Sequence, residues 1–128
     1  MVGKNVSAAD LLVQFRGVLD GMHHRAPEIC WQSLTAALEP TAVALGAEPT
    51  AHADAPAWSA TVHTLDASLA SDISEAAKAF SLALKEHYRT VTPRDQRVST
   101  AIAFLYMDVE RPLWSAHPSL EPAPLRSS

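Results

Sequence analysis

The sequence predicts an all-α protein, a compact bundle of five or six helices. Apolar residues recur at spacings of three and four along most of the chain, and no segment shows the strict alternation of a strand. The most apolar stretch, residues 98–109, carries apolar side chains on nearly every helical face. Such a helix needs cover on several sides, so we expect a central helix at about residues 93–110.

Composition limits the classes of protein that fit this chain. Its 128 residues suit one domain, and 48% hydrophobic residues is ordinary for a globular protein. The formal net charge of −4 favours neither nucleic acid nor an anionic membrane, and no apolar run is long enough to span a bilayer. The single cysteine, Cys30, excludes an internal disulfide and fits a reducing compartment. We therefore expect a cytoplasmic protein with no nucleic-acid or membrane partner.

The first helix is expected to begin at Ser7, which has capping-box spacing to Asp10. A second helix follows Pro27, with Glu28 in its first turn. Pro40 lies within its apolar stripe and is expected to kink or divide that helix. Gly46 ends the run.

Residues 46–56 contain two prolines and no large apolar side chain, which indicates a mobile internal linker. From Pro56 to Pro93 there is neither glycine nor proline, and one apolar stripe runs throughout. A single helix here would be about 50 Å long and would favour dimerisation. Two helices broken near residues 71–72 are the favoured alternative, with Asp72 as the cap and Glu75 completing a capping box.

The last helix is expected to start with Thr92 as its N-cap and Pro93 in its first turn. Pro112 is expected to end it, because proline lacks the N–H that continues a helix. The helical domain would then span residues 1–111. The proline-rich residues 112–128 would form an extended C-terminal tail.

A basic corner precedes the central helix and is the candidate site for a small anion. Free backbone N–H groups at a helix start attract anions, and arginines can join them around a phosphate or carboxylate. The candidate residues are His87, Tyr88, Arg89, Arg94 and Arg97. The same corner could suggest a helix-turn-helix, but that interpretation would expose the most apolar helix to a DNA groove.

The sequence gives no catalytic residues, no metal ligands and no cofactor motif. Six histidines are scattered along it, and the nearest approach to a metal motif is His63-x-x-Asp66. Glycine-rich phosphate loops and nucleophile motifs do not occur. The lack of these motifs favours a protein that is not an enzyme, although an enzyme with a pocket among its helices is the alternative.

The favoured function is therefore a protein–protein interaction module: an adaptor, an inhibitor or immunity-type partner, a chaperone or an assembly subunit. Trp58, Trp114 and Leu120 are the candidate interface residues, since tryptophan is enriched at binding hot spots. The partner is another protein or a second copy of this chain. The alternative is a binder of small anionic ligands, possibly an enzyme, at the basic corner.

Overall fold

The computed structural model describes residues 7–49, 55–90 and 95–120, and every regular element in these ranges is helical. The predicted all-α fold class is confirmed. The four longer helices are α1 (Ala8–Gly21), α2 (Glu28–Ala44), α4 (Ala67–Thr90) and α5 (Gln96–Phe104). The shorter elements are η1 (His23–Arg25), α3 (Trp58–Thr61), η2 (Val62–Thr64), the π-helical turn η3 (Leu105–Glu110), α6 (Arg111–Ala116) and η4 (Pro118–Leu120).

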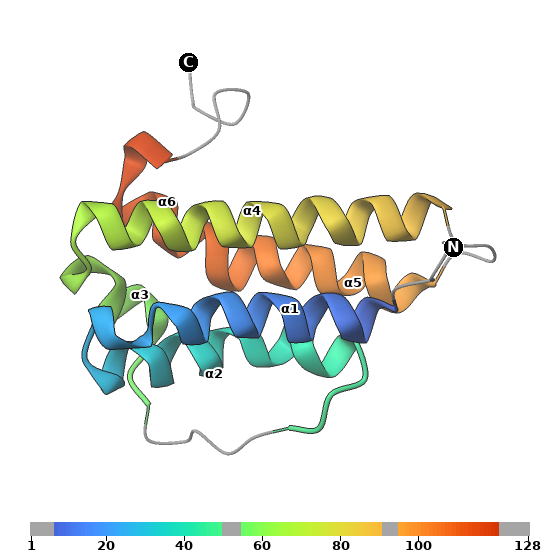
Figure 1. The fold of residues 1–128 in the computed structure, drawn as a ribbon, viewed down its shortest axis with the longest axis horizontal. Coiled ribbons are helices and arrows are strands. Elements are labelled where there is room, and N and C mark those ends of the chain that lie inside the picture. The colour runs from blue at the N-terminus through green and yellow to red at the C-terminus, as the bar shows by residue number, and fades with distance from the viewer. Residues whose placement is uncertain (1–6, 50–54, 91–94, 121–128) are drawn as a thin grey trace.

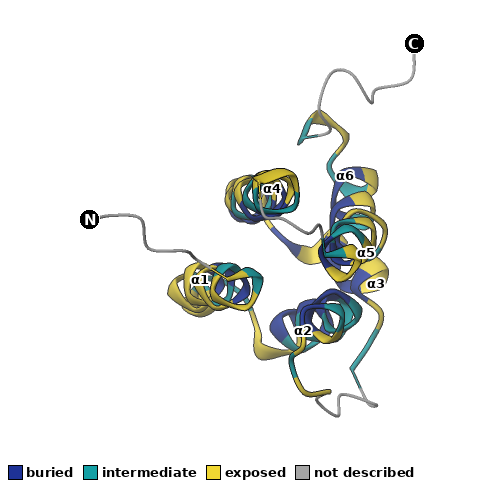
Figure 2. Cartoon of the chain, turned by 90° about the vertical axis from the view of Figure 1, so that its right-hand side faces the viewer, coloured by how far each residue is buried: buried dark blue, intermediate teal, exposed yellow. Residues whose placement is uncertain are grey.

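The longer helices lie side by side along the long axis of the molecule (Figure 1). Seen end-on, α1, α2, α4 and the continuous rod α5–η3–α6 turn their buried sides toward a common interior (Figure 2). One hydrophobic core joins all of them. Its most deeply buried large side chains include Leu34, Leu69, Leu84, Leu105 and Leu113.

The expected capping box starts α1. The Ser7 hydroxyl accepts a hydrogen bond from the Asp10 amide at 3.1 Å, and the Asp10 carboxylate accepts one from the Ser7 amide at 3.2 Å. Helix α2 runs unbroken through Pro40, so of the two expected effects of this proline the division of the helix does not occur. It ends where expected, at Gly46, whose φ of 97° is a conformation that glycine adopts readily.

The chain between residues 56 and 91 forms more than one helix, but the predicted position of the break near residues 71–72 is wrong. The chain turns at Leu65 and Asp66, and α4 then runs unbroken to Thr90. Asp66 acts as the cap, since its carboxylate accepts a hydrogen bond from the Leu69 amide at 2.7 Å. Asp72 instead forms an ion pair with Arg25 at 2.5 Å, which ties η1 to α4.

Helix α5 begins with Asp95 as its N-cap, whose side chain accepts a hydrogen bond from the Arg97 amide at 2.9 Å. The expected cap at Thr92 and the first-turn Pro93 lie outside the described residues. Asp95 was expected three residues inside the helix, so the described helix starts later than predicted.

The helix does not end before Pro112, and the expected extended tail does not begin there. Residues 105–110 form a π-helical turn, and α6 continues the same rod to Ala116. In a regular α-helix the proline ring would crowd the carbonyl of Asp108. The wider π-turn, with hydrogen bonds to the fifth residue, relieves that conflict. Residues 121–128 of the expected tail lie outside the described part.

The expected apolar stripe of Val98, Ala101, Ile102, Leu105 and Val109 faces the core. All of these side chains except the half-buried Ile102 are almost fully covered by neighbouring helices. Cover on the other faces is incomplete, and three large apolar side chains remain exposed there: Phe104, Tyr106 and Met107. None of the described helices is both apolar enough and long enough to cross a bilayer.

Candidate functional site

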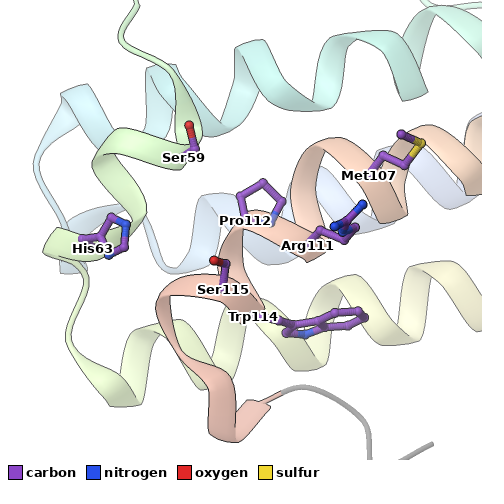
Figure 3. Close-up of a pocket in the computed structure, with 7 residues that line it drawn as sticks. All are labelled: Ser59, His63, Met107, Arg111, Pro112, Trp114 and Ser115. Carbon is purple, nitrogen blue, oxygen red and sulfur yellow. The ribbon is translucent and has the colours of Figure 1, made fainter. Parts of the chain in front are cut away.

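Two adjoining hollows flank the π-turn, and together we call them the η3 groove. The larger, of about 510 Å³, lies between the α3–η2 segment and the η3–α6 segment (Figure 3). It is lined by Ser59, His63, Met107, Arg111, Pro112, Trp114 and Ser115. The second, of about 310 Å³, shares Ser59, Met107 and Pro112 with it and extends to α2, where Ala36, Ala37, Pro40, Trp58 and Asp108 complete its lining.

Side-chain hydrogen bonds hold the two walls of the groove together. The Trp58 indole N–H donates to the Val109 carbonyl at 3.1 Å, which fastens α3 to the π-turn. His117 Nε2 lies 3.4 Å from the Val62 carbonyl, which links η2 to the end of α6. These bonds span more than fifty residues of sequence, so the shape of the groove is a product of the tertiary fold.

Three of the exposed large apolar side chains lie on or next to the π-turn, and one of them, Met107, lines the groove. Met107 is 56% exposed and lines both hollows, while Phe104 is 38% and Tyr106 is 37% exposed within the same four residues of chain. Tyr106 packs edge-on against Trp114, with ring centroids 5.9 Å apart. A cluster of exposed large apolar groups beside a hollow is typical of an interaction surface.

The two hollows differ in charge. The larger contains the cationic Arg111 and the imidazole of His63, and none of its lining residues carries a carboxylate. Arg111 is exposed and forms no ion pair with any residue in the described ranges. The second hollow contains Asp108, and partial burial raises the pKa of its carboxyl above the usual range.

Beneath the groove, on the same π-turn, Glu110 is only 6% exposed. Burial raises the pKa of its carboxyl to about 7, and the positive charge of Lys85 opposes that rise. Within the described part of the chain, no three or more histidine, cysteine, aspartate or glutamate side chains converge as metal ligands.

The basic corner predicted from the sequence is only partly assembled. His87 and Arg97 line a common hollow of about 230 Å³ near the start of α1, together with Asp95. Arg97 pairs with Asp95, with a closest distance of 2.9 Å between guanidinium and carboxylate. Their hydrogen bonds lower the pKa of the Asp95 carboxyl and raise that of the Arg97 guanidinium.

Tyr88 and Arg89 do not line this hollow. Tyr88 is half-buried, and its hydroxyl accepts a hydrogen bond from the Gln96 side chain at 3.3 Å. Arg89 is exposed and pairs with Glu86 one helical turn earlier. Arg94 lies outside the described residues.

Two of the three candidate interface residues, Trp58 and Trp114, line the η3 groove, and both are buried. Leu120 is half-buried against the core. Sequence reasoning missed Met107 and Arg111 as surface residues. The available signal was that Phe104 and Met107 lie off the main apolar stripe of their helix.

Comparisons of the chain with protein-family models, with curated proteins and with solved structures find no match.

Proposed function

We propose that this protein is an interaction module that binds another protein through the η3 groove. The observation that carries the proposal is the exposure of Phe104, Tyr106 and Met107 beside two adjoining hollows. Exposing these side chains to water is unfavourable, and covering them with a partner removes that cost at about 25 cal/mol per Å² of apolar surface. The contact is proposed to take place in the cytoplasm, which accords with the single, buried and unpaired Cys30.

The rigid construction of the groove supports this proposal. The hydrogen bond from Trp58 to Val109 and the edge-on contact of Tyr106 with Trp114 hold its shape before any partner arrives. A preformed surface binds with less loss of conformational entropy than one that must be ordered.

The test replaces Met107 with aspartate and compares capture of partners from a lysate of the native host. Val13→Asp is the matched control, because Val13 is also an exposed apolar residue but lies on α1, outside the groove. A photo-crosslinking amino acid at each position identifies direct contacts. We expect a protein that crosslinks at position 107, not at position 13, and that Met107→Asp no longer captures while Val13→Asp does. Capture that is the same for both variants, with no adduct at position 107, would refute the proposed function.

A second candidate, binding of a small anion at the basic corner, rests on the common hollow of His87 and Arg97. Because Asp95 already neutralises Arg97, we place it behind the interaction module. Inorganic phosphate should raise the melting temperature of the wild-type protein, and the rise should be lost in Arg97→Gln. An equal rise in the two proteins would exclude this site.

A further inference from the structure

We propose that the segment bound in the η3 groove carries a carboxylate beside apolar side chains, and that it belongs to a different protein. This inference rests on the proposed function, which it extends from the location of the surface to the chemistry of its partner. Three features of the groove lead to it: its charge, the order of its apolar and polar parts, and its concave shape.

The charge comes first. Arg111 projects into the larger hollow, with His63 on the facing wall (Figure 3). No carboxylate lines this hollow, and Arg111 has no ion pair within the described ranges. The protein as a whole is acidic, with a formal net charge of −4, so a hollow that contains a cation and no carboxylate is a local exception. A guanidinium binds carboxylates with two parallel hydrogen bonds, which makes a carboxylate the complementary group.

The positions of apolar and charged residues along the groove set the orientation in which the partner segment binds. Six of the eight residues that line the second hollow are apolar, and three of these, Ala36, Ala37 and Pro40, come from α2. This hollow already contains the Asp108 carboxylate, which would repel a second carboxylate placed there. The carboxylate of the partner therefore belongs at the Arg111 end, and its apolar side chains belong over Met107 and the α2 end.

The shape favours one extended segment as the occupant, because the two hollows adjoin and share Ser59, Met107 and Pro112. In a twofold-symmetric dimer each copy would present this same patch to the other. A second copy is therefore the alternative that a sedimentation measurement tests. Surface complementarity at the core of an interface normally matches that of protein interiors.

The experiment uses two fluorescein-labelled synthetic peptides with one leucine pattern and differing only in charge, one with glutamates and the other with lysines. Binding is measured by fluorescence anisotropy to the full-length wild-type protein. The variants are Arg111→Glu, Met107→Asp and the control Lys78→Glu, an equal charge reversal at an exposed position of α4 outside the groove. Circular dichroism verifies that each variant is folded, which the exposure of Arg111 and Met107 favours.

We expect the wild-type protein to bind the glutamate peptide at least tenfold more tightly than the lysine peptide. Arg111→Glu should weaken binding of the glutamate peptide at least tenfold and strengthen that of the lysine peptide, while Lys78→Glu changes either by less than twofold. Met107→Asp should abolish binding of both.

Equal binding of the two peptides, lost in Met107→Asp, would overturn the charge inference and leave the proposed function standing. Binding of neither peptide would likewise overturn only the inference, because crosslinking at position 107 tests the function separately. Binding that Met107→Asp does not weaken would count against the groove as the site and so against both. A concentration-dependent dimer in sedimentation, lost in Met107→Asp, would make a second copy the occupant and overturn the inference.

Discussion

At the scale of single residues, Glu110 combines a polar group with a buried position. It lies on the π-turn with 6% of its surface exposed, and no residue in the described part of the chain donates a hydrogen bond to its carboxylate. Lys85 offers only partial compensation, and the pKa of the carboxyl is about 7. Burial of an incompletely compensated charge costs folding free energy, so Glu110 weakens the fold when it is ionised.

Glu110→Gln should therefore stabilise the protein above pH 7. The pKa of Glu110 is about 7 in the folded protein, against 4.5 for the free side chain. The folded state thus holds the proton more tightly, and stability falls as the pH rises from 4.5 through 7. The full shift would correspond to about 3 kcal/mol, and some remaining contact with water reduces the expected gain of the glutamine variant to about 1–2 kcal/mol at pH 8.

Urea unfolding at pH 8, 6 and 4 measures this gain, with Glu75→Gln on the exposed side of α4 as the control. The gain should shrink with falling pH and vanish near pH 4, while the control stays near zero throughout. A gain that is independent of pH would show that Glu110 is not the titrating group.

At the scale of elements, the start of α4 depends on which carboxylate caps the helix. Asp72 was the expected cap, but it pairs with Arg25 from a distant part of the chain. The cap is Asp66, whose carboxylate accepts a hydrogen bond from the Leu69 amide. The helix therefore begins earlier than expected, and the residue expected to cap it forms a tertiary ion pair instead.

Asp66→Ala should destabilise the protein by about 1 kcal/mol, because it leaves an amide of the first turn of α4 without a partner. Asp66→Ser should retain most of the stability, since serine is also a good N-cap. Asp72→Ala should cost less than Asp66→Ala, because an exposed ion pair contributes little. Chemical denaturation of the three variants measures this order. A larger loss for Asp72→Ala than for Asp66→Ala would place the important helix start near residue 72.

At the scale of the whole molecule, the domain extends past the boundary expected at residue 111. Leu113 is completely buried in the common core, and Trp114 reaches α4, where its indole N–H donates to the Ser74 hydroxyl at 3.4 Å. Helix α6 is thus a structural part of the bundle. It also supplies one wall of the η3 groove, so stability and the proposed function share this element.

Leu113→Ala should lower the free energy of unfolding by about 2–5 kcal/mol, because it opens a cavity in a closely packed core. Ser115→Ala, at an exposed position of the same helix, should change it by less than about 0.5 kcal/mol. Thermal unfolding followed by circular dichroism compares the two. Should Leu113→Ala not fold, Leu113→Met is the milder variant, with an expected cost below about 1.5 kcal/mol. Similar melting temperatures for the leucine and serine variants would mean that α6 is a detachable tail.

The sequence by itself determined the all-α class, the capping box at Ser7, the end of α2 at Gly46 and the buried stripe of Val98, Ala101, Leu105 and Val109. Each of these follows from helical periodicity or from an interaction within a few residues, which the sequence displays directly.

Only the tertiary structure decided the break before α4, the π-turn that carries the helix past Pro112, and the exposure of Phe104 and Met107. The η3 groove belongs to the same group, because its five elements, α2, α3, η2, η3 and α6, come from three separate stretches of the chain. Whether an apolar side chain is covered depends on which helices pack beside it, and whether a proline ends a helix depends on its surroundings, since α2 runs through Pro40 and α6 continues past Pro112. The local pattern of residues reveals neither condition.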